Sequence, residues 1–357
     1  MTIYIKTMSE DDDKEVVAEA CISIADIIKD VGYMAVEPYM PRLVEATLIL
    51  LREDSACQQI ESDSEIDEDD TEHDEVLMDA VSDLLPAFAK ALGTQFAPIF
   101  SQLYEPLMKF AVSELLPNQC YMEKLAPASG EFKRFHNCQL QKQSRPPQDR
   151  TMVVATLAEV AQHMGAPIAG YADEIMHLVL KELGSPEATN RRNAAFCAGE
   201  LCKNGGNSVL KYYTNVLNRL YPLFGESEPD NAVRDNAAGA VARMIMAHPE
   251  SVPLNQVLPV FLQVLPLKED YEESTSVYGC ICNLVLSSNS QIMSFVPQLV
   301  NIFAQVAASS AETPEVKVYI GRTFSHLLSI YGHQMQPLLG SLSPVHANAL
   351  AAIAPKG

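Results

Sequence analysis

The residues of this chain best suited to chemistry are carboxylates, and the densest group of them is one run. Ten of the fifteen residues from 61 to 75 are acidic and none is lysine or arginine. Self-repulsion keeps such a run solvated, which predicts a disordered acidic loop. A basic protein would be attracted to it and would associate faster. The alternative is a solvated linker that only aids solubility. The candidate binding residues in this run are Asp67, Glu68, Asp69 and Asp70.

A second group of polar residues returns at similar places along the chain. Glu159 and Glu200 are 41 residues apart, and Asn193 and Asn236 are 43 residues apart. Two interpretations remain open: a ladder of side chains that binds an extended basic peptide on a concave face, or hydrogen bonds and helix caps within the protein. The candidate binding residues of this group are Glu200, Asp235, Asn236, Asp270, Glu272 and Glu273.

Patterns typical of enzymes are absent from the sequence. It has no glycine-rich phosphate loop, no nucleophile elbow and no zinc-protease histidine pair. Cysteines such as Cys197, Cys202, Cys280 and Cys282 fall in apolar helical runs, without a second pair at metal-ligand spacing. We therefore expect no catalytic residue, no metal and no cofactor, and a protein that is not an enzyme.

Charge narrows the class of partner. The chain of 357 residues has a formal net charge of −21, and residues 1–114 alone hold 26 acidic against 7 basic side chains. This sign repels nucleic acid and attracts basic proteins. No apolar run is long enough to cross a membrane, and the first residues lack a signal-peptide core. We therefore expect a protein of the cytoplasm and nucleus that binds neither nucleic acid nor membranes.

The elements that must position these side chains repeat about every 40 residues. Each repeat pairs an apolar helix, often opened by an aromatic residue and a proline, with an alanine-rich helix. This recurrence predicts an all-α fold, an α-solenoid of about 7–8 helix pairs, superhelical, with the first pair partial. The expected helices span residues 12–31, 39–52, 74–92, 96–112, 148–164, 169–183, 187–204, 208–224, 230–247, 254–266, 270–288, 291–308, 313–331 and 333–352.

Two segments interrupt the rhythm. One is the acidic loop 61–75, and the other is residues 113–148, a proline-containing stretch that separates two helices of one pair and is therefore expected to be an inserted loop. Because helix pairs share their core with their neighbours, residues 1–357 are expected to form one solenoid. The helix at 12–31 lacks a full partner before it, which indicates a piece of a longer protein; the resemblance described next implies that this piece is C-terminal.

Several segments resemble the HEAT repeats of the importin-β (karyopherin-β) transport receptors. These are Ala232–Arg243, Val264–Asp270, Phe96–Pro98 and Leu339–Leu342, and the resemblance covers most of 12–350 but fails over about 113–143. It implies the cargo-binding part of a nuclear import receptor. The implied cargo is basic, such as histone H3/H4 tails or ribosomal proteins. Ran-GTP is expected to bind mainly through N-terminal repeats that this chain lacks, and nucleoporins are further expected partners. The competing interpretation is a HEAT-repeat scaffold or a histone or assembly chaperone not engaged in transport.

Overall fold

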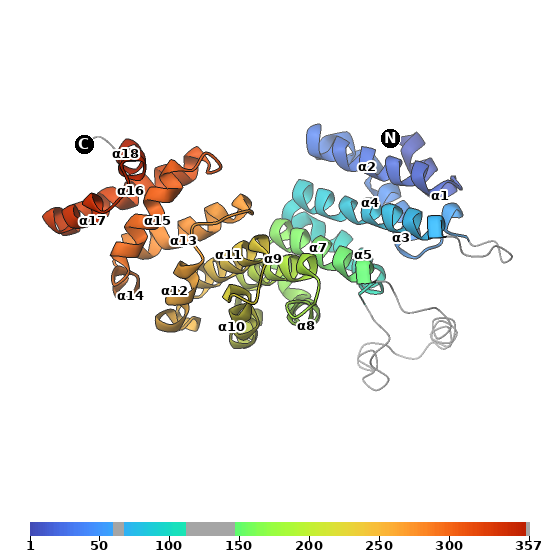
Figure 1. Ribbon diagram of the computed structural model, residues 1–357. Coiled ribbons are helices and arrows are strands. Elements are labelled where there is room, and N and C mark those ends of the chain that lie inside the picture. Colours follow the sequence, from blue (N-terminus) through green and yellow to red (C-terminus); the bar gives the residue numbers. More distant parts are fainter. Residues whose placement is uncertain (60–67, 112–146, 355–357) are drawn as a thin grey trace. The chain divides into compact units, whose positions relative to one another are not determined.

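The computed structural model describes residues 1–59, 68–111 and 147–354, and within these ranges the chain is helical and contains no β-strand (Figure 1). The prediction of an all-α fold built from helix pairs is confirmed. The chain divides into two compact units, Met1–Thr156 and Leu157–Gly357. No helix in the described ranges is both long and apolar enough to cross a membrane.

The first unit is built from helices that pack against one another in neighbouring pairs. Helix α2 packs against α4, α3 packs against α5, and α1 packs against both α2 and α3. Their bounds are α1 (Thr2–Glu10), α2 (Lys14–Asp30), α3 (Met40–Leu51), α4 (Glu68–Leu92) and α5 (Ala97–Met108), and α7 (Pro147–Met164) continues into the second unit. The first pair is more complete than we expected, because Thr2–Glu10 forms a helix that buries Ile5 and Met8.

In the second unit, the alanine-rich helices of successive pairs pack side by side. Helix α9 packs against α11, α11 against α13 and α13 against α16. The pairs are α8 (Ala172–Glu182) with α9 (Ala188–Asn204), α10 (Tyr213–Leu220) with α11 (Asn231–Ala247), α12 (Leu254–Gln263) with α13 (Ser274–Leu286), and α15 (Val296–Ala308) with α16 (Pro314–Tyr331). The short helices are α14 (Ser290–Met293), α17 (Gln336–Gly340) and α18 (Pro344–Ile353), and α18 packs against α15 and α16.

Local sequence explains where several helices begin. The Asp13 carboxylate accepts the N–H groups of Glu15 and Val16 at the start of α2. In the same way Asp230, Thr313 and Ser343 cap α11, α16 and α18. Such caps satisfy N–H groups that have no partner within the helix. Ser343 and the proline that follows it also explain why the predicted helix 333–352 is divided into α17 and α18.

Helix boundaries differ from the predicted ones at three functionally relevant places. Helix α4 begins at Glu68, so residues 68–75 of the predicted acidic loop are helical, while 61–67 lie outside the described residues. The predicted insertion 113–148 also lies outside them, except that Pro147 already begins α7. Helix α13 starts at Ser274, because Tyr271–Glu273 forms a separate 3-10 turn.

Candidate functional site

A buried ion cluster joins three successive helix pairs of the second unit. Arg243 of α11 binds Glu200 of α9 through Nε, 2.6 Å from Oε1, and binds Glu273 through Nη1 and Nη2, at 2.5 and 3.1 Å. The exposed fractions of Arg243, Glu200 and Glu273 are 6%, 0% and 3%, so all three charges are removed from water. Burial raises the pKa of Glu273, and the neighbouring guanidinium opposes that rise. Charges buried at this depth are tolerated only when they are paired in this way.

Two further residues of α11 bind the segment that precedes α13. Asp235 Oδ2 accepts the N–H groups of Lys268, Glu269 and Asp270 at 3.0, 2.8 and 3.0 Å. Asn236 Nδ2 donates to Asp270 Oδ2 at 2.7 Å and to the Ala232 carbonyl. These bonds satisfy three N–H groups of a turn that has no helix of its own to satisfy them. The arrangement holds the turn against α11.

These contacts favour the second of the two interpretations left open for the recurring polar residues, hydrogen bonding within the protein, at four of the six positions. Glu200, Asp235, Asn236 and Glu273 are buried and bound to other parts of the chain. Direct contact with a cargo would require exposed carboxylates. The other interpretation of these positions, hydrogen bonding within the stack, describes them correctly.

The remaining predicted residues divide into two groups. Asp270 is half-buried and accepts the N–H of Glu272, whereas Glu272 itself is exposed. Asp67 lies outside the described residues, and Glu68, Asp69 and Asp70 are the first residues of α4. Among the recurring polar residues predicted to bind a peptide, Glu272 is therefore the one that the structure leaves exposed.

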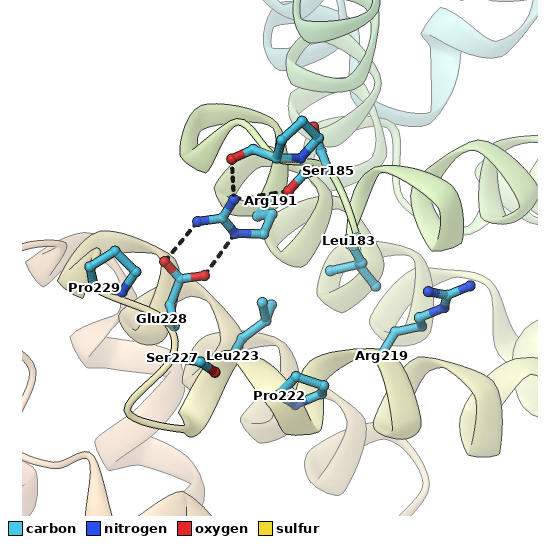
Figure 2. Close-up of a pocket in the computed structure, with 11 residues that line it drawn as sticks. Leu183, Ser185, Arg191, Arg219, Pro222, Leu223, Ser227, Glu228 and Pro229 are labelled. Carbon is cyan, nitrogen blue, oxygen red and sulfur yellow. Dashed lines mark hydrogen bonds and ion pairs between the residues drawn. The ribbon is translucent and has the colours of Figure 1, made fainter.

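A pocket of about 470 Å³ lies where the turn between α8 and α9 meets the turn before α11 (Figure 2). On one side, Arg191 binds both carboxylate oxygens of Glu228, at 2.7 and 2.8 Å, and donates to the carbonyls of Ser185 and Pro186 (Figure 2). Leu183 and Leu223 supply buried apolar surface. Because Arg191 and Glu228 are engaged with each other, this side of the pocket serves to join two helix pairs.

Exposed acids gather instead on the first unit, along the two adjacent helices α2 and α4. We name this group the α2–α4 ridge; its residues are the exposed Glu19, Asp26, Asp30, Asp79 and Asp83 and the half-buried Glu75. Partial burial raises the pKa of Asp79, and the nearby carboxylates of Asp83 and Glu75 raise it further. Partial burial also raises the pKa of Asp83, while Lys29 lowers it and Asp26 of α2 raises it. The acids of the two helices therefore act on one another across the packed pair.

The ridge was missed at the sequence level, although a signal for it exists. Glu75, Asp79 and Asp83 follow one another at intervals of four residues, which places them on one face of α4. Asp26 and Asp30 have the same spacing on α2. Neither pattern shows that the two faces adjoin, because that depends on the packing of α2 against α4.

A metal site and a reactive cysteine are two further kinds of chemistry, and the described residues favour neither. Among them, no three histidine, cysteine, aspartate or glutamate side chains are grouped so as to hold a metal ion. Burial raises the pKa of Cys21, Cys202 and Cys280 to about 12, which leaves these thiols protonated and poorly nucleophilic at neutral pH.

No protein-family model matches this chain, but curated relatives do. Human importin-4 is 28% identical over 98% of this chain, and a probable importin subunit beta-4 of Schizosaccharomyces pombe is 31% identical over 71% of it. The chain spans only 30% and 21% of these two relatives.

Solved structures show the same fold. A mutant form of Kap121p matches with a TM-score of 0.66 and 16% sequence identity. The match covers 99% of this chain and 29% of the Kap121p chain. Importin beta has a TM-score of 0.60 at 13% identity over 99% of this chain and 42% of its own. Kap121p bound to the SUMO protease Ulp1p has a TM-score of 0.65 at 16% identity over 99% of this chain and 29% of its own.

Proposed function

Because this chain belongs by homology to the importin-β (karyopherin-β) family of nuclear import receptors, we propose that it is a cargo-binding part of such a receptor. Its relatives are importins, and Kap121p, which shares its fold, has been crystallised with partner proteins. The chain corresponds to less than a third of its curated relatives. The proposal therefore concerns one step, the holding of cargo, in the cytoplasm and the nucleus.

The observation that carries the proposal is the α2–α4 ridge. Carboxylates four residues apart on a helix destabilise it by about 0.2–0.5 kcal/mol for each pair. Here partial burial raises the pKa values of Asp79 and Asp83, and neighbouring carboxylates add to the rise: Glu75 and Asp83 act on Asp79, and Asp26 of α2 acts on Asp83 against the opposing effect of Lys29. A ligand rich in lysine and arginine would relieve this repulsion when it binds. The ridge is thus better suited to a basic partner than to solvent alone.

The acidic run and the ridge overlap in sequence, because Glu75 belongs to both. Residues 68–75 of the run are the first residues of α4, and the same helix carries Asp79 and Asp83. We propose that the run attracts a basic cargo from solution and that the ridge, already ordered, holds it. Electrostatic attraction of this kind mainly increases the association rate. Histone H3/H4 tails and ribosomal proteins are the cargo class we propose, because both are rich in basic residues.

A peptide-binding titration with matched variants tests this proposal. A fluorescent histone H3 tail peptide is titrated with the full chain at low and at physiological salt. The ridge variant is Asp26→Lys with Asp79→Lys. The control is Glu45→Lys with Glu105→Lys, two exposed acids of α3 and α5 that change the net charge equally.

The ridge variant should lose at least about tenfold in affinity at low salt, and the control should lose much less. Salt should weaken binding by the unaltered chain, because exposed charges are screened beyond a Debye length of about 8 Å. Equal losses for both variants would show that net charge alone attracts the peptide. Unchanged affinity in the ridge variant would overturn the proposal.

A further inference from the structure

In the second unit, the contacts between neighbouring helix pairs differ in kind from one boundary to the next. Between α9, α11 and the start of α13, the connections are buried, charged and numerous. We name these connections the Arg243 clamp; its residues are Glu200, Asp235, Asn236, Arg243, Asp270 and Glu273. Arg243 alone reaches one helix pair on each side of its own. Separating the second of these pairs from the third would leave the buried Glu273 without its counterion, and separating the first from the second would leave Glu200 with Lys203 alone.

Backbone packing follows the same three helices. A β-carbon on Gly199 of α9 would lie 2.8 Å from the Ala240 Cα atom of α11. A β-carbon on Gly239 of α11 would overlap the carboxylate of Glu273. Glycine therefore lets each neighbour approach more closely than any other residue would allow. The polar clamp and the close packing support the same arrangement of α9, α11 and α13.

The boundary between the α12–α13 pair and the α15–α16 pair is different. Gly279 of α13, 40 residues after Gly239, has no atom within 4 Å of the place a β-carbon would take. In the described part of this boundary we find no salt bridge. Neutral polar contacts cross it: Gln298 Nε2 donates to the Leu262 carbonyl at 3.1 Å, and the Thr323 hydroxyl of α16 lies beside the Cys282 thiol of α13.

Polar atoms at this boundary are also incompletely satisfied. Ser274 at the start of α13 is 1% exposed and its Oγ has no hydrogen-bond partner. Glu312, just before α16, is 6% exposed; the nearby Ser274 hydroxyl and Lys317 favour its charged form, but its Oε2 has no partner at hydrogen-bond geometry. Unsatisfied buried groups oppose the conformation that buries them. A small movement that admits water would give each of these two atoms a hydrogen-bond partner and is therefore favoured.

We propose that α9, α11 and α13 move as one rigid block, and that the second unit bends at the boundary between α13 and α16. Bending inside the block would break buried ion pairs and disturb glycine contacts. Bending at the α13–α16 boundary would move mainly apolar surfaces past each other and would hydrate Ser274 and Glu312. Domain motions of this sliding type need no unfolding. The block is independent of the proposed cargo surface, which lies on the first unit.

Distances between pairs of spin labels can test this in the full chain. One pair, Arg192→Cys with Asn283→Cys, spans the block from α9 to α13. The other, Thr275→Cys with Ser329→Cys, spans only the boundary from α13 to α16. All four positions are exposed. Cys120 and Cys138 are replaced by serine, and the six cysteines of the described residues are buried, which protects them from the label.

The block pair should give a narrow distance distribution, although it crosses two helix boundaries. The α13–α16 pair should give a distribution at least about twice as wide. Adding Arg243→Lys should widen the first distribution and leave the second unchanged, because lysine keeps the charge but cannot bind both glutamates with a planar fork. Urea unfolding of each labelled chain confirms that it is folded.

A block distribution as wide as that of the α13–α16 pair would overturn the proposal. So would an unchanged block distribution in the folded Arg243→Lys chain, since the clamp would then not hold the helices. A further variant, Glu312→Gln, removes the buried charge at the boundary and should narrow the α13–α16 distribution. Widening of that distribution by Glu312→Gln would also contradict the proposal.

Discussion

The carboxylate of Glu273 occupies the space in which a β-carbon on Gly239 would lie, and its Oε2 atom is the nearest atom to that position. The same oxygen binds Arg243, one turn further along α11. Glycine at 239 is thus what allows the carboxylate to lie flat against the helix and reach the guanidinium. This relationship explains a glycine in a helix interior, where it would otherwise destabilise the helix.

Gly239→Ala is expected to destabilise the second unit strongly. The added methyl group displaces Glu273, and breaking a buried ion pair typically costs about 3–5 kcal/mol. The free energy of unfolding, measured by urea denaturation followed by circular dichroism, should fall by an amount in this range.

Gly279→Ala is the matched control for that experiment. The same substitution at the next equivalent position meets no atom within 4 Å. Alanine has a higher helix propensity than glycine, so stability should rise by up to about 1 kcal/mol. Similar destabilisation by both substitutions would refute the packing argument.

Arg243→Met is expected to destabilise the protein by about 3–5 kcal/mol, because it leaves the buried Glu273 carboxylate without its counterion and leaves Glu200 with Lys203 alone. Adding Glu200→Gln and Glu273→Gln should restore much of the loss, since no buried charge then remains. The single variant should also gain stability as the pH is lowered, because protonation neutralises the buried Glu273 carboxylate that has lost its partner. Urea denaturation at two pH values measures both effects, and a triple variant no more stable than the single one would contradict them.

As the pH is lowered, the affinity for a basic peptide should begin to fall at a higher pH than it would if the binding carboxylates had ordinary pKa values. The pKa values of Asp79 and Asp83 are raised, so these groups lose their negative charge above the usual value of about 3.9. Affinity for the histone H3 tail peptide should therefore fall as the pH drops through this raised range. Asp79→Asn with Asp83→Asn should bind more weakly at neutral pH and show a flatter pH profile, whereas an unaltered profile would exclude these residues from the binding surface.

Glu312→Gln should stabilise the second unit at neutral pH. Burial raises the pKa of Glu312 in the folded protein, so the folded state holds this proton more tightly than the unfolded chain. The stability of the unaltered chain should therefore fall as the pH rises from about 4.3 through the raised pKa. The glutamine variant should lack this part of the decline and be more stable by about 1 kcal/mol at pH 7. Parallel stability curves for the two proteins would contradict this assignment.

Part of this protein follows directly from its sequence. The recurrence near 40 residues predicts helix pairs, because only such pairs bury an apolar face at that interval against a neighbour. Breakers such as the Gly184-Ser185-Pro186 turn place the ends of helices α8 and α9. Homology to the importins agrees with the resemblance seen in segments such as Ala232–Arg243.

The roles of the carboxylates were decided only by tertiary packing. In α11, nearly every residue from Val233 to Ile245 is buried, because neighbouring helices cover it on most sides. Helical periodicity separates a buried face from an exposed one, and it gives no guidance where both faces are covered. Whether Glu200 meets a ligand or an arginine therefore depends on Arg243, 43 residues away. The α2–α4 ridge depends in the same way on which helix packs beside which, because only that packing brings Asp26 and Asp83 within electrostatic reach of each other.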